Sequence, residues 1–152
     1  MTSWSARLTE LGIELPQVVA PLAAYVPAVR TGNLVYTAGQ LPISGGELQA
    51  TGKVGAEVSA EDAKDLARQC ALNALAAIDA LVGIDAVVKI VKVVGFVASA
   101  PGFDGQPGVI NGASELFGEV FGENGAHARS AVGVSELPRN APVEVEVIAE
   151  VS

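Results

Sequence analysis

A long helical pattern in the middle of the chain, followed directly by a β-branched run, constrains the fold more than any other feature. Ser59 and Asp62 resemble a capping box at the start of residues 60–82, with Asp in place of the usual Glu. Gly83 suits the C-terminal cap. One apolar stripe runs along this segment at helical spacing, formed by Ala63, Leu66, Cys70, Ala74, Ile78 and Leu81. The pattern predicts one long helix that buries a single face.

The β-branched run at residues 87–97 has little alternation, which predicts a strand covered on both faces. We expect helices on one face and another subunit on the other. Lys89 and Lys92 interrupt the longest apolar tract, residues 86–100, so it does not predict a membrane span. Hydrophobic residues make up 50% of the chain, and the mean hydropathy is +0.42. The excess apolar surface is therefore expected at the interface of a homo-oligomer.

The remaining segments predict shorter elements on either side of this centre. We expect a short helix at 5–12, strands at 25–30 and 34–38, a loop at 44–55, a helix at 107–121, and strands at 128–134 and 143–151. The second helix places Ile110, Ala113, Phe117 and Val120 on its inner side. The order ββαβαββ predicts an α+β two-layer sandwich, with a mixed sheet and two helices on one face, in one domain over residues 1–152.

The charge balance and the cysteine content exclude several classes of protein. A net charge of −8 without a cluster of Lys or Arg disfavours nucleic acid and anionic membrane surfaces as partners. The first residues lack the apolar core of a secretion signal, so a cytoplasmic location is expected. Cys70 is the only cysteine and His127 the only histidine, so we expect neither a disulfide framework nor a metal site. Cys70 falls on the apolar stripe and is interpreted as a core residue.

Arg129 and Glu144 are the candidate functional pair. They lie fifteen positions apart, at the ends of two strands that we expect to be neighbours, in a chain with only 17% charged residues. A guanidinium offers a planar fork that matches a carboxylate or phosphate, and a glutamate can bind an ammonium group or activate a water molecule. The pair therefore suggests a site for a small amino or imino acid. An Arg–Glu ion pair inside the sheet is the open alternative.

Two sets of motifs resemble the signatures of the RidA/YjgF family. Tyr25-Val26, followed by Thr31-Gly32-Asn33-Leu34-Val35-Tyr36-Thr37-Ala38-Gly39-Gln40-Leu41-Pro42, resembles the N-terminal signature. Residues 128–130, 136–138 and 142–146 resemble the C-terminal one. The resemblance covers residues 25–151, and residues 7–16 are similar to a longer branch of the family. Residues 1–24 are accordingly interpreted as an N-terminal extension.

The resemblance implies a chorismate mutase-like fold that assembles as a homotrimer with sites in the clefts between subunits. It also implies hydrolysis of reactive 2-imino acids and their enamines to 2-oxo acids and ammonia, without metal or organic cofactor. In this scheme Arg129 holds the substrate carboxylate together with the backbone N–H of Ala131, and Glu144 holds the attacking water. Tyr25 lines the cleft from the adjacent subunit, and Asn111 and Gly39 shape the pocket.

Four residues depart from the family pattern as the sequence presents it. Ala131 stands where many deaminases of the family carry Cys, Gly133 replaces a bulkier or acidic residue, Ala38 replaces a Ser, and His127 replaces a Pro. The anchor for a carboxylate survives these changes, but the lining around the reacting carbon becomes smaller and less polar. A non-catalytic trimer that binds small carboxylates is therefore the alternative function. Ribonuclease activity agrees poorly with the acidic composition.

Overall fold

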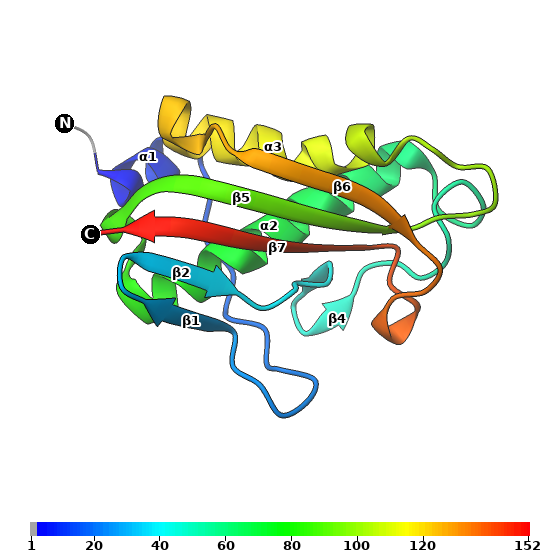
Figure 1. The fold of residues 1–152 in the computed structure, drawn as a ribbon, viewed down its shortest axis with the longest axis horizontal. Helices are drawn as coiled ribbons and strands as arrows, with labels where there is room; N and C mark the ends of the chain where they lie inside the picture. The colour runs from blue at the N-terminus through cyan, green and yellow to red at the C-terminus, as the bar shows by residue number, and fades with distance from the viewer. Residues whose placement is uncertain (1–2) are drawn as a thin grey trace.

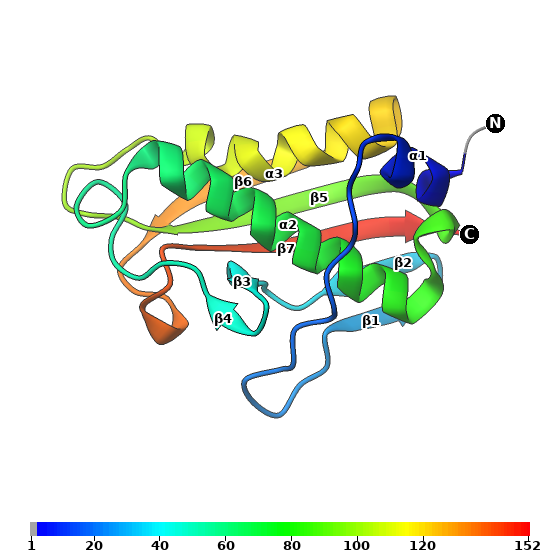
Figure 2. The same ribbon diagram turned by 180° about the vertical axis from the view of Figure 1, so that it is seen from behind.

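The protein is a two-layer α+β sandwich, described over residues 3–152 by a computed structural model. A five-stranded sheet forms one layer, and helices α2 and α3 cover one of its faces (Figures 1 and 2). The helices are α1 (Trp4–Glu10), α2 (Ala60–Val82) and α3 (Gln106–Phe121). The strands of the large sheet are β1 (Ala28–Thr31), β2 (Leu34–Thr37), β5 (Val87–Ala98), β6 (Ala128–Val134) and β7 (Val143–Val151). The predicted fold class and element order are confirmed.

The last strand of the chain lies at the centre of the sheet. The strand order is β1-β2-β7-β5-β6, with β5 and β6 parallel and every other pair antiparallel. Valines 143, 145 and 147 are buried toward the helices, while Glu144 and Glu146 lie on the opposite, open face. This alternation is the one predicted from the sequence.

The segment predicted as a loop contains a small hairpin. Strands β3 (Ile43–Ser44) and β4 (Glu47–Leu48) pair across Gly45 and Gly46, whose φ angles are 60° and 81°. Two-residue strands are too short to produce a readable alternation, so sequence patterns miss them. The first strand also begins at Ala28 and not at Tyr25, because Pro27 has no N–H to donate to a ladder.

The buried face of α2 is wider than the predicted stripe. Cys70 and Ile78 are fully buried as expected, but Leu81 is 44% exposed, and Ala67, Ala71 and Leu75 belong to the core. The reason is that α2 packs against both the sheet and α3. Gly112 of α3 lies so close that an added Cβ would stand 1.9 Å from the carbonyl oxygen of Lys64.

The open face of the sheet is apolar and uncovered in the single chain. Val29, Tyr36, Val88 and Val132 are between 40% and 52% exposed. Strand β5 is therefore buried on one face only, by residues such as Val93 and Val97. Cover for the other face remains a prediction about a further subunit. No helix within residues 3–152 is long and apolar enough to cross a membrane.

The N-terminal helix α1, expected from the sequence, is anchored at one end of the sandwich. Trp4 Nε1 donates a 2.7 Å hydrogen bond to the Val87 carbonyl, and its ring meets Phe121 edge to face at 5.1 Å. The Ser5 amide and hydroxyl both donate to Asp85, and these bonds lower the pKa of that carboxyl. From here the chain passes along the helix layer and returns to the sheet at β1 (Figure 2).

Gly112→Ala is expected to lower the free energy of unfolding by about 2–4 kcal/mol, because the new methyl group must push α2 and α3 apart. Gly118→Ala in the same helix meets no atom within 4 Å and is expected to raise it by about 0.5–1 kcal/mol. Urea unfolding followed by circular dichroism measures both. Equal stability of the two variants would contradict the close helix packing.

Candidate functional site

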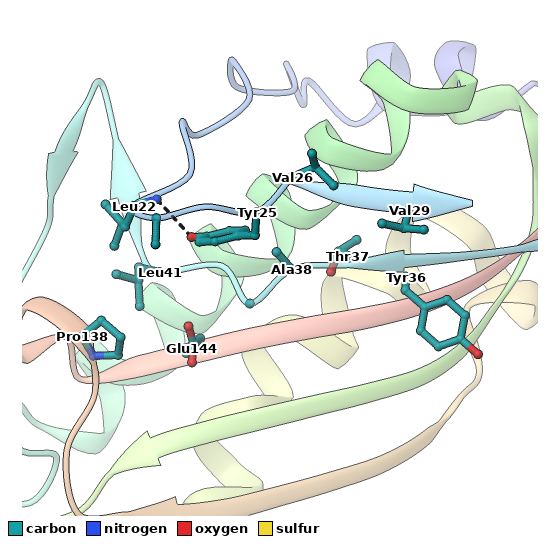
Figure 3. A pocket seen from close by; sticks show the side chains of 12 residues that line it. Leu22, Tyr25, Val26, Val29, Tyr36, Thr37, Ala38, Leu41, Pro138 and Glu144 are labelled. Carbon is teal, nitrogen blue, oxygen red and sulfur yellow. Dashed lines mark hydrogen bonds between the residues drawn. The ribbon is translucent and has the colours of Figure 1, made fainter. Parts of the chain in front are cut away.

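A cavity of about 830 Å³ lies on the open face of the sheet around Glu144. We call it the Glu144 pocket. It is lined by Leu22, Ala23, Tyr25, Val26, Val29, Tyr36, Thr37, Ala38, Gly39, Leu41, Pro138 and Glu144 (Figure 3). Glu144 is the only acidic or basic side chain in this lining, and most of the other side chains are apolar. The pocket therefore presents one carboxylate in a largely apolar surround.

Gly39 brings the backbone close to the Glu144 carboxyl group. A Cβ at this position would lie 2.7 Å from Glu144 Oε1, so only glycine leaves the carboxyl where it is. The neighbouring Gln40 exchanges two backbone hydrogen bonds with Val145, of 2.8 and 3.0 Å. The bend at Gly39-Gln40 thus forms the pocket wall beside β7.

Asn73 of α2 fixes this wall from behind. Its side chain is fully buried and donates to the carbonyls of Leu41 and Ile43 at 3.0 and 2.9 Å. Gln69 donates to the Asn73 side-chain oxygen at 3.1 Å. Sequence reasoning missed Asn73, although an asparagine among alanines on a buried helix face is a usable signal, because a buried amide needs partners.

Burial raises the pKa of Glu144, and the negative charge of Glu146 raises it further. Among residues 3–152, no Lys, Arg or His forms an ion pair with Glu144. A half-buried carboxyl with a raised pKa is suited to exchanging a proton with a bound water or substrate.

Tyr25 and the residues just before it line the Glu144 pocket. Its hydroxyl accepts a 3.1 Å hydrogen bond from the Leu22 amide, so the segment 22–25 closes on itself at the pocket rim (Figure 3). The Tyr25 ring remains 46% exposed. The structure thus brings Tyr25, Gly39 and Glu144 together within one chain.

Arg129 belongs to a second group of residues, on the helix face of β6. Its Nη1 donates to Asn111 Oδ1 at 2.8 Å and to Ser114 Oγ at 3.2 Å, and its Nη2 donates to the Pro107 carbonyl at 3.3 Å. We call Arg129, Asn111, Ser114 and His127 the Arg129 cluster. The three groups that accept hydrogen bonds from Arg129, on Asn111, Ser114 and Pro107, are all neutral. Two of the five guanidinium N–H donors have no partner among residues 3–152, so they can bind an anion.

The backbone beside Arg129 adds a further donor. Ser99 N–H donates to the Val134 carbonyl, so the polar groups of Val134 point from β6 toward β5. Peptide directions alternate along a strand, and β6 is an edge strand, so the N–H of Ala131 points off the free edge of the sheet. Ala131 and Arg129 also share one face of β6. Gly133 leaves room for Gln106, whose side chain would lie 2.8 Å from an added Cβ.

The two groups do not meet within one chain. Strand β5 separates β6 from β7, so Arg129 and Glu144 are not on neighbouring strands as the sequence suggested. Through the register, Glu144 is level with Val132, three residues beyond Arg129. Strand spacings of about 4.8 Å and a rise of about 3.3 Å per residue put their Cα atoms roughly 14 Å apart, with side chains on opposite faces. No Arg129–Glu144 ion pair forms among the described residues.

The two-layer fold, with helices on one sheet face and an uncovered apolar face on the other, defines an α+β sandwich domain. The family model described as Endoribonuclease L-PSP matches residues 16–151. The Protein TCP17 of Trypanosoma cruzi is 42% identical over 97% of this chain and 94% of its own length. A RutC family protein of Haemophilus influenzae is 35% identical, over 90% and 94%. The chain belongs to the Endoribonuclease L-PSP family, which includes the RidA and YjgF proteins.

Solved structures agree with this assignment. Atu1372 of Agrobacterium tumefaciens, a protein with unknown function, has a TM-score of 0.90 and 44% identity, covering 98% of this chain and 92% of that chain. The E. coli YjgF gene product has a TM-score of 0.64 and 32% identity, covering 88% and 93%. E. coli TdcF with bound serine has a TM-score of 0.67 and 27% identity, covering 90% and 94%.

Glu144→Gln is expected to gain stability relative to the natural protein at neutral pH. The folded-state pKa of Glu144 lies above its ordinary value of 4.5, so ionising this carboxyl costs folded-state stability as pH rises through that range. The difference between the two free energies of unfolding should shrink as the pH falls below 4.5. Urea unfolding between pH 4 and 8 measures it, and a difference that grows in acid would contradict the raised pKa. Glu146→Gln should lower the pKa of Glu144 and shift the dependence toward lower pH.

Proposed function

We propose that this protein hydrolyses reactive 2-imino acids and their enamines to 2-oxo acids and ammonia, in a site shared between subunits of a homotrimer. One observation carries the proposal: a held guanidinium and a half-buried carboxyl, neither with an ionic partner among residues 3–152, lie on opposite faces of the same sheet. A substrate with an anionic end and an electrophilic carbon needs both groups. Only a second copy of the chain can bring an Arg129 beside a Glu144.

The proposed reaction divides the substrate between the two groups. The two remaining N–H donors of Arg129, together with the Ala131 N–H, bind the substrate carboxylate. Glu144 accepts a proton from a water molecule as the water oxygen bonds to the C=N carbon, which gives a carbinolamine. Starting from the protonated imine, Glu144 then returns the proton to the carbinolamine nitrogen. The remaining hydroxyl proton passes to Glu144 as the C–N bond breaks, so ammonia leaves and the carbinol oxygen becomes the 2-oxo group. The raised pKa of Glu144 suits a group that takes and gives the same proton.

Two further features support a shared site. The exposed apolar side chains of the open face support a subunit interface of the kind that the hydropathy predicts. TdcF was solved with serine, an α-amino acid that carries the same carboxylate as a 2-imino acid. The ribonuclease in the family's name fits this chain less well, because a net charge of −8 and an apolar pocket offer little to a phosphate backbone.

The deaminase assay generates 2-aminoacrylate or 2-iminobutanoate in place with a pyridoxal-phosphate dehydratase and measures the release of the 2-oxo acid. The natural protein should accelerate this release, and Arg129→Ala should lower kcat/KM about 100-fold through loss of the carboxylate anchor. Unchanged acceleration by the variant would remove Arg129 from the mechanism. Carboxylate binding without any acceleration by the natural protein would favour the non-catalytic binding function.

Mixing variants tests the sharing of the site. Arg129→Ala and Glu144→Gln trimers should each be nearly inactive, because every cleft lacks one group. Trimers reassembled from an equal mixture should recover part of the natural activity, since some clefts then combine Glu144 of one copy with Arg129 of another. Mixed trimers as inactive as their parents, or a natural protein that sediments as a monomer, would contradict the shared site.

A further inference from the structure

We propose that Ser114 and His127 are positioning residues for Arg129, and that they set the direction of its guanidinium for carboxylate binding. This inference rests on the proposed role of Arg129 as the anchor. The sequence assigns neither residue a functional role, and His127 stands there only in place of the family's Pro. In the structure a continuous chain of hydrogen bonds runs from the Gly125 carbonyl through His127 and Ser114 to Arg129.

The direction of each hydrogen bond follows from the acceptors. His127 Nδ1 lies 2.6 Å from the Gly125 carbonyl oxygen, which can only accept, so Nδ1 carries a proton. In the neutral ring Nε2 is then an acceptor, and the Ser114 hydroxyl donates to it across 2.8 Å. That donation uses the only proton of the hydroxyl, and its oxygen lone pairs accept the Arg129 Nη1 proton at 3.2 Å. The imidazole thus turns a freely rotating hydroxyl into a fixed acceptor.

The far end of this chain is held by packing. Gly125 is buried, and an added Cβ there would stand 2.2 Å from the Phe117 carbonyl oxygen, so the turn Gly122–Gly125 lies tightly against α3. The His127 ring meets the Phe117 ring edge to face at 5.9 Å. These contacts fix the Gly125 carbonyl and the imidazole. The orientation of Arg129 therefore depends on the helix layer as well as on its own strand.

Local geometry explains why these residues converge. His127 and Arg129 are two positions apart, so they point to the same side of the β6 backbone. Asn111 and Ser114 are three positions apart on α3, so both face the edge of the sheet. The guanidinium is held between two side chains of one helix face, and the imidazole fixes the second of them. The two donors left to Arg129 then keep a constant direction at the sheet edge.

The kinetic test separates positioning from catalysis. Ser114→Ala removes one hydrogen bond to a charged group, which corresponds to about a tenfold increase in KM for the imino acid, with kcat within about twofold. Ser114→Thr keeps the hydroxyl and should restore KM. His127→Phe keeps the ring packing on Phe117 and should raise KM by a smaller factor. Gly118→Ala, one turn along the same helix, serves as the control with natural KM. An unchanged KM in Ser114→Ala, or a loss in kcat alone, would overturn the proposal.

A spectroscopic test is independent of turnover. His127 is the only histidine, so its two ¹⁵N imidazole resonances are assigned without ambiguity. In the neutral ring they should report the Nδ1–H tautomer in the natural protein and in Ser114→Thr. Adding 2-oxobutanoate should shift them in both proteins and not in Arg129→Ala. Binding of 2-oxobutanoate, seen at the Ala131 amide, without any imidazole shift would overturn the proposal.

The two tests distinguish this inference from the proposed function. A natural protein without imine hydrolysis that still binds 2-oxobutanoate, with the imidazole shift and with weaker binding in Ser114→Ala, would end the deaminase proposal and support the positioning chain. If Ser114→Ala does not fold, Ser114→Thr and His127→Phe still decide the question. Natural binding constants in Arg129→Ala would overturn the inference whatever the activity.

Discussion

The central position of β7 is the constraint on which the rest of the structure depends. This strand pairs with β2 on one side and with β5 on the other. The hydrogen bonds on both sides fix the sheet face toward which each of its side chains points. Its valines form the middle of the core under α2, and its glutamates must therefore appear on the open face. Glu144 is held in a half-buried place because the neighbouring valines are fully buried.

The carboxyl at this place costs stability, and the surrounding structure offsets that cost. Burial and Glu146 both disfavour the charged form, and no cation of residues 3–152 compensates. Meanwhile Gly39 leaves space for the carboxyl, and Asn73 fixes the adjacent backbone through buried hydrogen bonds. An arrangement that keeps a carboxyl partly desolvated and well oriented favours proton exchange over structural pairing.

Arg129 is the complementary case, because it is a cation without a counter-ion in the part of the chain that the structure describes. Neutral acceptors from α3 hold its guanidinium, and they neither neutralise the charge nor occupy all its donors. The crossover from β5 through α3 to β6 makes these two strands parallel neighbours and puts Arg129 against that helix. The same crossover places β5 between Arg129 and Glu144. A single chain thus keeps the two charged groups on opposite faces of the sheet and leaves one apolar sheet face uncovered.

The sequence by itself determined the elements and the orientation of residues within each of them. Local periodicities predict α2 with its Ser59 cap, the inner face of α3 and the alternation of β7. Each of these patterns lies within one segment of the chain, so the segment alone is enough to predict it. The family motifs in the sequence also identify Arg129, Glu144, Tyr25 and Gly39 as candidate site residues. Only the tertiary structure decided that β6 and β7 are separated and that Arg129 faces α3. It also decided that hydrogen bonds link His127 and Ser114 to Arg129, and Asn73 to the backbone of Leu41 and Ile43. These outcomes depend on which strands become neighbours and on contacts between residues distant in sequence, and no local period encodes them.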